Sequence, residues 1–322
     1  MLCLLLFLAC LSRYTAYENL LTSQQAAQRW TGQSEERFAQ ISCFLPIDST
    51  FDESGVQTLR QNLEKKLLEA SLKTPETGSL WTDAYAGFST LSVSGTRGAA
   101  TATAIGVGGD FFLFHPLTLR NGSYINGDDL MKDRVVLDEE LAWKLFGGVE
   151  LAGLTVTINN QLYQVVGVVS REKDPFSNKA YGDGDACIYV DYSVIAATNE
   201  QGITCYEVAM PDPISEFAFN TVEAIFPDKR GAILENNTRY RLANIVKLIT
   251  DSDERVMQKN GVAYPYWENA ARLVENRMTL LLPCLAFLTL FPMGCVSYMI
   301  IKQYLKLLRK WQKRRAEKLE YQ

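Results

Sequence analysis

The chain has 322 residues, 47% of them hydrophobic, which is enough for one large domain or two with a substantial core. Its formal net charge of −5 is unevenly distributed, because the tail after Ile301 carries eight basic and two acidic residues and leaves the remainder strongly acidic. With one histidine, seven cysteines and no Cys-x-x-Cys pair, the composition argues against zinc and haem sites.

The N-terminal segment, residues 1–16, starts with an apolar run from Met1 to Leu11. This run is too short to cross a bilayer, which takes about 20 residues. It also lacks the positively charged start of a signal peptide. We interpret it as the outer end of a first transmembrane helix, with a signal-like sequence as the alternative. Residues 14–36 are expected to continue this helix outward.

Apolar periodicity predicts the elements of the body, residues 17–277. The first part has a strand at 38–46, a helix over 56–70, and strands at 80–91 and 99–107 joined by a loop at 92–98. The middle part has a strand at 134–137, a helix over 141–145, a hairpin at 155–169, a loop at 174–185 and a strand at 187–190. The last part has a strand at 203–210, a helix over 214–225, a strand at 239–249 and a helix over 251–277.

Two local patterns carry the strongest structural signals. Period-2 alternation on both sides of Asn159-Asn160 predicts a tight hairpin, since asparagine tolerates positive φ. Asp138 stands where the N-cap of the following helix would lie, and Gly147-Gly148 ends that helix. The order strand, short helix, hairpin therefore defines the central stretch from Ile105 to Val169.

Residues 278–301 contain no charged side chain and are long enough to cross about 30 Å of hydrocarbon. The basic tail, residues 302–322, follows at once. By the positive-inside rule this tail is cytoplasmic and the acidic body lies outside the cell membrane. The basic tail is expected to contact anionic lipid rather than nucleic acid.

The central stretch resembles a known domain. The segments IGVGGDFFLFHPLTLRNGSYI, DRVVLDEELAWKLFGG and LAGLTVTINNQLYQVVGVV occur in that order over about 65 residues. In combination they are similar to the periplasmic core domain of ABC transporter permeases of the MacB/FtsX type. The resemblance implies an α+β fold in which an extracytoplasmic strand–helix, porter-like subdomain carries a small β-rich insert at about 112–190. Transmembrane helices would flank this domain.

No catalytic, cofactor-binding or metal-binding constellation is found in the sequence. His115 precedes Pro116 and is interpreted as a turn residue. The acidic residues Asp174, Asp183 and Asp185 lack a glutamate at EF-hand spacing and are interpreted as an exposed loop. The glycines after Gly106 lack P-loop and Rossmann spacing. We therefore expect no enzymatic activity, no cofactor and no metal.

Several acidic residues and the cysteines are interpreted as structural rather than functional. The acidic run Asp138 to Glu140 is interpreted as solvated charge at a helix start. The body cysteines are interpreted as buried free thiols, with a Cys187–Cys205 disulfide as the alternative if those strands pair.

The resemblance implies a partial or accessory subunit of a MacB/FtsX-type transporter in the plasma membrane. Its partners would be an ABC ATPase and other permease subunits on separate chains. Its outer domain would contact partners and couple motion across the membrane. The alternative is a single-span binding or regulatory protein that uses the same domain to recognise a cell-envelope ligand.

Overall fold

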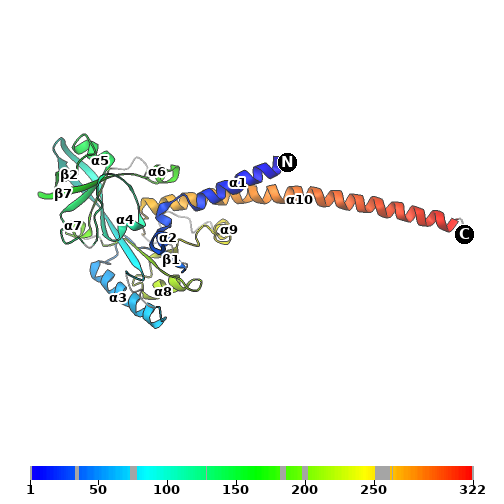
Figure 1. Cartoon of the computed structure of the whole chain (residues 1–322), viewed down its shortest axis with the longest axis horizontal. Helices are drawn as coiled ribbons and strands as arrows, with labels where there is room; N and C mark the ends of the chain where they lie inside the picture. Colours follow the sequence, from blue (N-terminus) through cyan, green and yellow to red (C-terminus); the bar gives the residue numbers. More distant parts are fainter. Residues whose placement is uncertain are drawn as a thin grey trace. The chain divides into compact units, whose positions relative to one another are not determined.

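The structure is a computed structural model that describes residues 2–32, 36–72, 78–127, 129–181, 186–197, 202–250, 262 and 264–320 (Figure 1). The chain divides into two compact units. One unit, Leu20–Val274, is a mixed α/β domain. The other consists of Met1–Asn19 and Glu275–Gln322, and it holds helix α1 and most of helix α10.

The described elements have the following bounds. The helices are α1 (Leu2–Glu18), α2 (Ala26–Thr31), α3 (Glu53–Glu69), α4 (Phe111–Phe114), α5 (Glu139–Leu145), α6 (Pro175–Tyr181), α7 (Tyr192–Ala196), α8 (Phe217–Ile225), α9 (Leu242–Thr250) and α10 (Tyr266–Glu320), with a 3-10 turn η1 (Thr22–Gln24). The strands are β1 (Phe38–Phe44), β2 (Thr82–Gly95), β3 (Gly98–Gly109), β4 (Thr118–Gly122), β5 (Arg134–Asp138), β6 (Thr155–Ile158), β7 (Gln161–Ser170), β8 (Cys187–Asp191), β9 (Cys205–Pro211) and β10 (Ala232–Glu235).

All of these strands belong to one ten-stranded sheet. Its order is β10-β1-β9-β2-β3-β8-β5-β7-β4, and β6 pairs with both β2 and β7. The pairs β3–β8 and β5–β7 are parallel, and the other pairs are antiparallel. The long β2–β3 hairpin lies in the middle of this order, so it connects the β1, β9 and β10 part of the sheet to the β5, β7 and β8 part.

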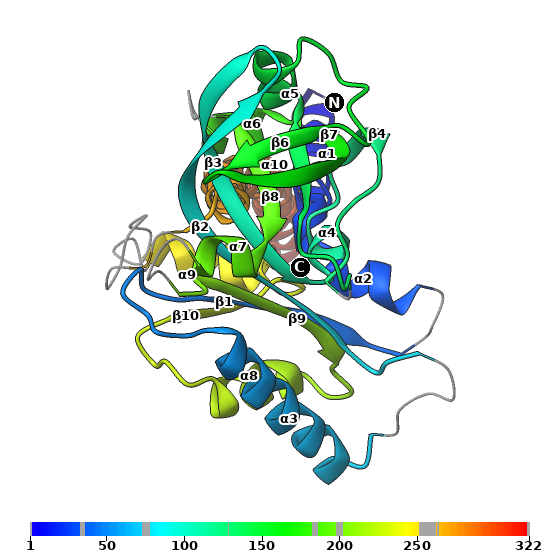
Figure 2. The same cartoon turned by 90° about the vertical axis from the view of Figure 1, so that its left-hand side faces the viewer.

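Helices α3 and α8 cover one face of the β1, β9 and β10 part (Figure 2). Helix α3 begins at Asp52, whose side chain accepts a hydrogen bond from the backbone N–H of Gly55 at 2.9 Å, as an N-cap does. One face of this helix is buried, and its members are Val56, Leu59, Leu63 and Leu67. Their spacing of three and four residues is the predicted apolar stripe, so the sequence pattern is confirmed here.

The strongest local predictions are also confirmed. Asp138 caps α5, because its carboxylate accepts the backbone N–H of Leu141 at 2.7 Å. Asn159 and Asn160 connect β6 to β7 with φ values of 50° and 63°. Two consecutive residues at positive φ match the right-handed twist of the flanking strands, and this is why an Asn-Asn pair closes the hairpin.

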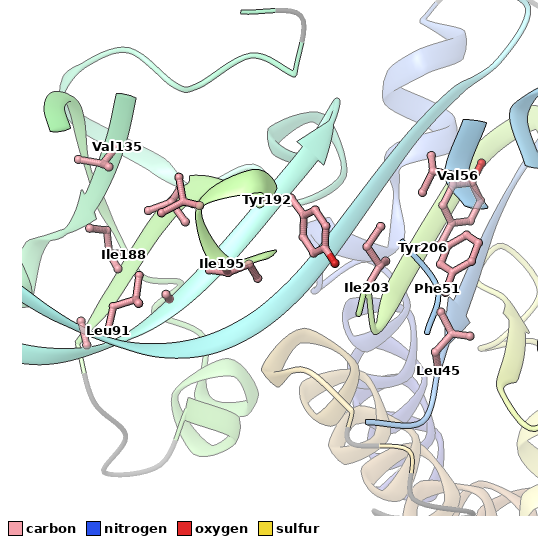
Figure 3. Close-up of a cluster of buried hydrophobic side chains, with 14 of the residues drawn as sticks. Leu45, Phe51, Val56, Leu91, Val135, Ile188, Tyr192, Ile195, Ile203 and Tyr206 are labelled. Carbon is pink, nitrogen blue, oxygen red and sulfur yellow. The ribbon is translucent and has the colours of Figure 1, made fainter. Parts of the chain in front are cut away.

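One continuous apolar cluster runs through the domain. Figure 3 shows Phe51, Val56 and Tyr206 gathered on the α3 side, and Val135 and Ile188 on the β5 and β8 side. Tyr192, Ile195 and Ile203 lie between these two groups in the figure. The predicted insert at 112–190 thus shares a sheet and a core with the elements that flank it, and its boundaries remain a prediction.

The predicted loop at 92–98 is wrong. Strands β2 and β3 extend to Gly95 and Gly98 and pair along their whole length, so only Thr96 and Arg97 turn. Small and polar residues gave this segment a loop-like composition. The side chain of Val93 is nevertheless fully buried, and Val93 pairs with Ile158 of β6. Strand pairing on both sides overrides the low strand propensity of serine and glycine.

Other boundaries also differ from the predictions. Helix α6 occupies most of the described part of the predicted loop 174–185, because Asp174 caps it by accepting the N–H groups of Phe176 and Ser177. Residues 182–185 lie outside the described residues, as do residues 251–261 of the predicted helix over 251–277. The polar segment 14–36 continues the first helix only as far as Glu18, where α1 ends, and η1 and α2 follow.

Most of the predicted strand at 239–249 is instead helical, because α9 begins at Leu242. The segment contains the β-branched residues Ile245, Val246 and Ile249, a type enriched in strands. The apolar residues Leu242, Ile245, Val246 and Ile249 instead follow helical spacing. Tertiary context therefore decided between two patterns that a short apolar run allows.

The alternative of a Cys187–Cys205 disulfide is wrong, because both thiols are free. Cys187 lies on β8 and Cys205 on β9, and β2 and β3 separate these strands in the sheet. Three strand spacings amount to about 14 Å. A disulfide requires Cα atoms within about 7 Å, so this pair cannot be bridged without rearranging the sheet.

Candidate functional site

The candidate site is a buried junction between the sheet and the first turn of α10, which we call the α10 junction. Its residues are His115, Glu207, Arg239, Trp267 and Glu268. All five lie in the Leu20–Val274 unit and all are buried. They come from the end of α4, from β9, from the segment after β10 and from α10.

Trp267 is the aromatic centre of the α10 junction. Its ring centroid lies 4.2 Å from that of His115, 5.7 Å from that of Phe88 and 5.8 Å from that of Phe111. Phe88 belongs to β2 and Phe111 to α4. A single large side chain from α10 therefore packs against two elements of the domain, and aromatic pairs at such distances add to the stability that their burial provides.

His115 is more than the predicted turn residue. It does terminate α4 as its C-cap, before Pro116. Its ring, however, is buried between Phe111 and Trp267, and its Nε2 contacts Oε2 of Glu207. Sequence reasoning missed this contact because the two residues are 92 positions apart. The only available signal was a lone histidine beside an aromatic run.

Glu207 is held by partners on the neighbouring strand. Its Oε1 accepts hydrogen bonds from Ser42 Oγ at 2.6 Å and from Gln40 Nε2 at 3.2 Å, both on β1. Gln40 also donates to the backbone oxygen of Ser23 at 2.8 Å and accepts from the N–H of Ala26 at 2.8 Å. These bonds compensate for burying a carboxylate and tie the segment before α2 to the sheet.

Charged side chains complete the α10 junction. Arg239 forms two bonds to Glu268, at 2.6 Å from Nη1 to Oε2 and at 2.8 Å from Nη2 to Oε1. Arg272, one turn further along α10, donates to Glu268 Oε1 at 2.8 Å. Burial alone would raise the pKa of Glu268, but the two arginines outweigh it and hold this pKa below its usual value.

The thiols nearby do not have the environment of nucleophiles. Burial, together with the charge of Glu207, raises the pKa of the Cys43 and Cys205 thiols. Burial also raises the pKa of Cys187 to about 12. Reactive cysteines need a lowered pKa and access to solvent, so these three side chains act as small apolar residues of the core.

The remaining predicted candidates do not converge on a chemical site. Asp174 caps α6, and Asp183 and Asp185 lie outside the described residues. Asp138 was predicted to be solvated, and this prediction is wrong. Its side chain is buried, and its Oδ2 lies 2.6 Å from Arg171 Nη2. Among the described residues, no group of three or more His, Cys, Asp and Glu side chains is placed to hold a metal.

Helix α10 carries the apolar stretch predicted at 278–301. Within the part of the chain that the structure describes, it is the one helix with the length and composition needed to cross a membrane. Pro283 and Pro292 lie inside it, and the helix continues through both. Residues 268–277 belong to the same helix, so the predicted continuity between the body and the apolar stretch is confirmed.

Comparison with known proteins identifies the domain. The family model described as MacB-like periplasmic core domain matches residues 25–221. A curated relative, the macrolide export ATP-binding/permease protein MacB of Chromobacterium violaceum, is 26% identical over 156 residues. That match covers 47% of this chain and 23% of the relative, so the chain spans less than a quarter of the relative's length.

Three solved structures are also similar. The periplasmic region of MacB from Actinobacillus actinomycetemcomitans has a TM-score of 0.46 and 19% identity, covering 66% of this chain and 92% of that one. The extracellular domain of the transporter YknZ from Gram-positive bacteria has a TM-score of 0.37 and 14% identity, covering 56% and 88%. A domain of a permease protein from Porphyromonas gingivalis has a TM-score of 0.35 and 12% identity, covering 66% and 97%.

The match to residues 25–221 includes more than half of the chain and the whole central stretch that carries the resemblance. It also includes three strands of the sheet's middle, β2, β3 and β8, together with β9. This chain therefore belongs to the family of proteins that contain a MacB-like periplasmic core domain.

Proposed function

We propose that this chain is a partial or accessory subunit of a MacB/FtsX-type ABC transporter. Its domain at 17–277 lies outside the cell membrane, contacts partner proteins and couples their motion to the membrane through α10. The observation that carries this proposal is the α10 junction. Buried charged and aromatic side chains fasten the first turn of α10 to three separate parts of the domain.

The physical basis of the coupling is stiffness. Force passes between a domain and a helix only if their connection resists bending. Residues 268–277 contain no glycine or proline, and Ala270, Ala271, Leu273 and Val274 stand in this segment. Alanine and leucine have high helix propensity, which favours an unbroken helix. Residues 278–301 would then move with the domain as one body.

The partners are proposed from the family to which the domain belongs. We propose that an ABC ATPase on another chain hydrolyses ATP for this transporter. The similar protein from Chromobacterium violaceum is named as an ATP-binding/permease protein, and the matched region is a small part of it. We propose that other permease subunits also assemble with this chain, and that the chain itself is not an enzyme.

Co-purification from detergent extracts tests the proposal. The full chain, tagged at its C-terminus and expressed in its own host, is expected to bring down a protein with ABC ATPase sequence at a reproducible stoichiometry. An unrelated single-span protein with the same tag is the control. Isolation of the tagged chain without any ATPase, under conditions that preserve known transporters of this type, would contradict the proposal.

A second candidate function has one observation in its favour. A cavity of about 600 Å³ lies between the start of α3 and the segment after α8, and Ser49, Asp52, Thr58, Asn62, Asp228 and Arg230 are among its lining residues. A cavity of this size is in the range of small-molecule sites. It favours the single-span protein that binds a cell-envelope ligand, for which α10 would be only an anchor.

The proposed topology makes a prediction of its own. We expect residue 322 to lie in the cytoplasm and residue 130 outside, because the charge-free stretch 278–301 separates an acidic body from a basic tail. Leu130 is 97% exposed, so a Leu130→Cys variant should react with a membrane-impermeant maleimide in intact cells. A cytoplasmic reporter fused after Gln322 should be active. Both positions on the same side of the membrane would refute the topology.

A further inference from the structure

Helix α9 has an apolar stripe that the domain covers only in part. Leu242, Val246 and Ile249 are spaced by four and three residues, and their exposed fractions are 59%, 47% and 48%. Ile245, at one edge of the same face, is fully buried and attaches the helix to the domain. The domain therefore covers only that edge, and it leaves a row of large apolar side chains about half exposed.

The position of α9 along the chain indicates which surface could cover this stripe. Arg239, three residues before the helix begins, is bound to Glu268 of α10 at 2.6 Å. Glu268 in turn lies ten residues before Met278, where the charge-free stretch begins. At 1.5 Å per residue this is about 15 Å of helix. The start of α9 is thus fixed to a point on α10 that is close to the expected membrane surface.

We propose that α9 lies on the outer surface of the same bilayer that α10 crosses, with Leu242, Val246 and Ile249 in the lipid interface. This inference rests on the proposed function, because it needs α10 to span a membrane. It deepens that proposal, since α9 would be a second contact that limits how the domain tilts. The occupant of the stripe is the lipid surface itself.

The composition of α9 fits an interfacial helix. Its nine residues span about 13 Å, which is far too short to cross a bilayer but sufficient to lie along one. Arg241 and Lys247 flank the stripe and are exposed, and their aliphatic stems let the charged ends reach headgroups. Three acidic residues follow in the sequence, namely Asp251, Asp253 and Glu254. Apolar burial, not attraction to anionic lipid, is therefore the driving force.

A protein partner fits this stripe less well than lipid does. A stable protein interface buries about 800 Å² on each partner, and three side chains fall well short of that area. A bilayer contact needs much less, because α10 already holds α9 near the membrane and the second contact is intramolecular. Interfacial helices insert their apolar face about 5–10 Å into the boundary between headgroups and acyl chains.

Lipid quenching of a fluorophore on α9 tests the inference. In a background where Cys3, Cys10, Cys284 and Cys295 are serine, the full-length Val246→Cys variant is labelled with an environment-sensitive dye and placed in phosphatidylcholine liposomes. Cys43, Cys187 and Cys205 are buried and stay unlabelled. Lipids with a nitroxide near the headgroup should cause about a twofold loss of emission, as the expected depth of an interfacial helix requires.

Two controls separate the possible results. Leu68 on α3 is 71% exposed and can be labelled in the same way. It is not part of the proposed lipid contact, so a Leu68→Cys label should be unaffected by the nitroxide. A variant that keeps Cys295, inside the apolar stretch, reports whether α10 has entered the bilayer. Quenching at Cys295 without quenching at position 246 overturns the inference about α9 alone. No quenching at either position contradicts the proposed membrane insertion as well.

A third result identifies another occupant. If the dye at position 246 shifts to the blue but lipid nitroxides do not quench it, a protein surface covers the stripe. A second copy of the chain or a bound partner would then be the occupant, and the lipid assignment would be wrong. Repeating the measurement at one chain per liposome would distinguish the two, because the blue shift would then disappear if a second copy of the chain were the occupant.

Discussion

Replacing Glu268 by alanine is expected to lower the free energy of unfolding of the domain by about 3–5 kcal/mol, the cost of removing one partner of a buried ion pair. Glu268 and Arg239 are both buried, so the variant leaves the Arg239 guanidinium without the two bonds that compensate for its burial. Urea unfolding of residues 17–277, followed by tryptophan fluorescence, measures the change. Trp267 lies next to Glu268 in the sequence and reports on the α10 junction directly.

A matched control is available on α3. Glu69 pairs with Lys66 at 2.9 Å, but both side chains are about half exposed. Glu69→Ala should therefore leave the unfolding curve almost unchanged, since solvent screens such pairs. If Glu268→Ala and Glu69→Ala have the same small effect, the buried pair does not hold α10 to the domain, and the structural basis of the proposed coupling is lost.

The same residue gives the domain a dependence on pH. The pKa of Glu268 is lower in the folded domain than in the unfolded chain, where a glutamate titrates near 4.3. Its ion pairs thus contribute full stability above that unfolded value. The contribution is lost as the pH falls through the folded pKa. Glu268→Gln should flatten the acid limb of the stability profile.

Inserting a flexible Gly-Ser linker after Val274 is expected to abolish function while the protein still folds, enters the membrane and binds its partners. The reach of such a linker grows only as the square root of its length, and it transmits almost no force. Helix α10 runs without interruption through this point. The measurement is complementation of a strain that lacks the gene, together with co-purification of the ATPase.

A helical insert of seven residues is the matched control for the linker. It adds nearly two full turns and about 10 Å of helix. The helix therefore becomes longer but stays stiff, and the residues after the insert keep almost the same rotation about the helix axis. It should retain more function than a Gly-Ser insert of equal length. Full function with the flexible insert would instead favour the single-span binding protein, in which α10 anchors the domain without moving it.

Local patterns predicted the elements whose determinants are close together in the sequence. The stripe from Val56 to Leu67, the N-cap at Asp138 and the turn at Asn159-Asn160 each need only a few neighbouring residues. The family resemblance depended on such elements in their order. Because these local elements were predicted in their order along the chain, the mixed α/β class could be predicted. The order of the strands in the sheet depends on distant pairings and could not.

The α10 junction could not be predicted from the sequence, because its contacts join distant positions. His115 and Glu207 are 92 residues apart, and Arg239 and Glu268 are 29 apart. Periodicity shows which residues are buried but not which buried charges meet. A lone histidine and a glutamate inside an apolar strand carry no spacing that connects them, so only the folded structure reveals their contact.

Strand β1 has a further consequence for how the protein is made. It pairs with β9 on one side and β10 on the other, as in Ile41 with Val208 and with Glu235. Both neighbours are synthesised more than 160 residues after β1. Contacts of such long range form slowly, because a large loop must close first. Until β9 has been made, β1 is therefore an unpaired, apolar segment, and such segments are prone to non-native contacts during folding.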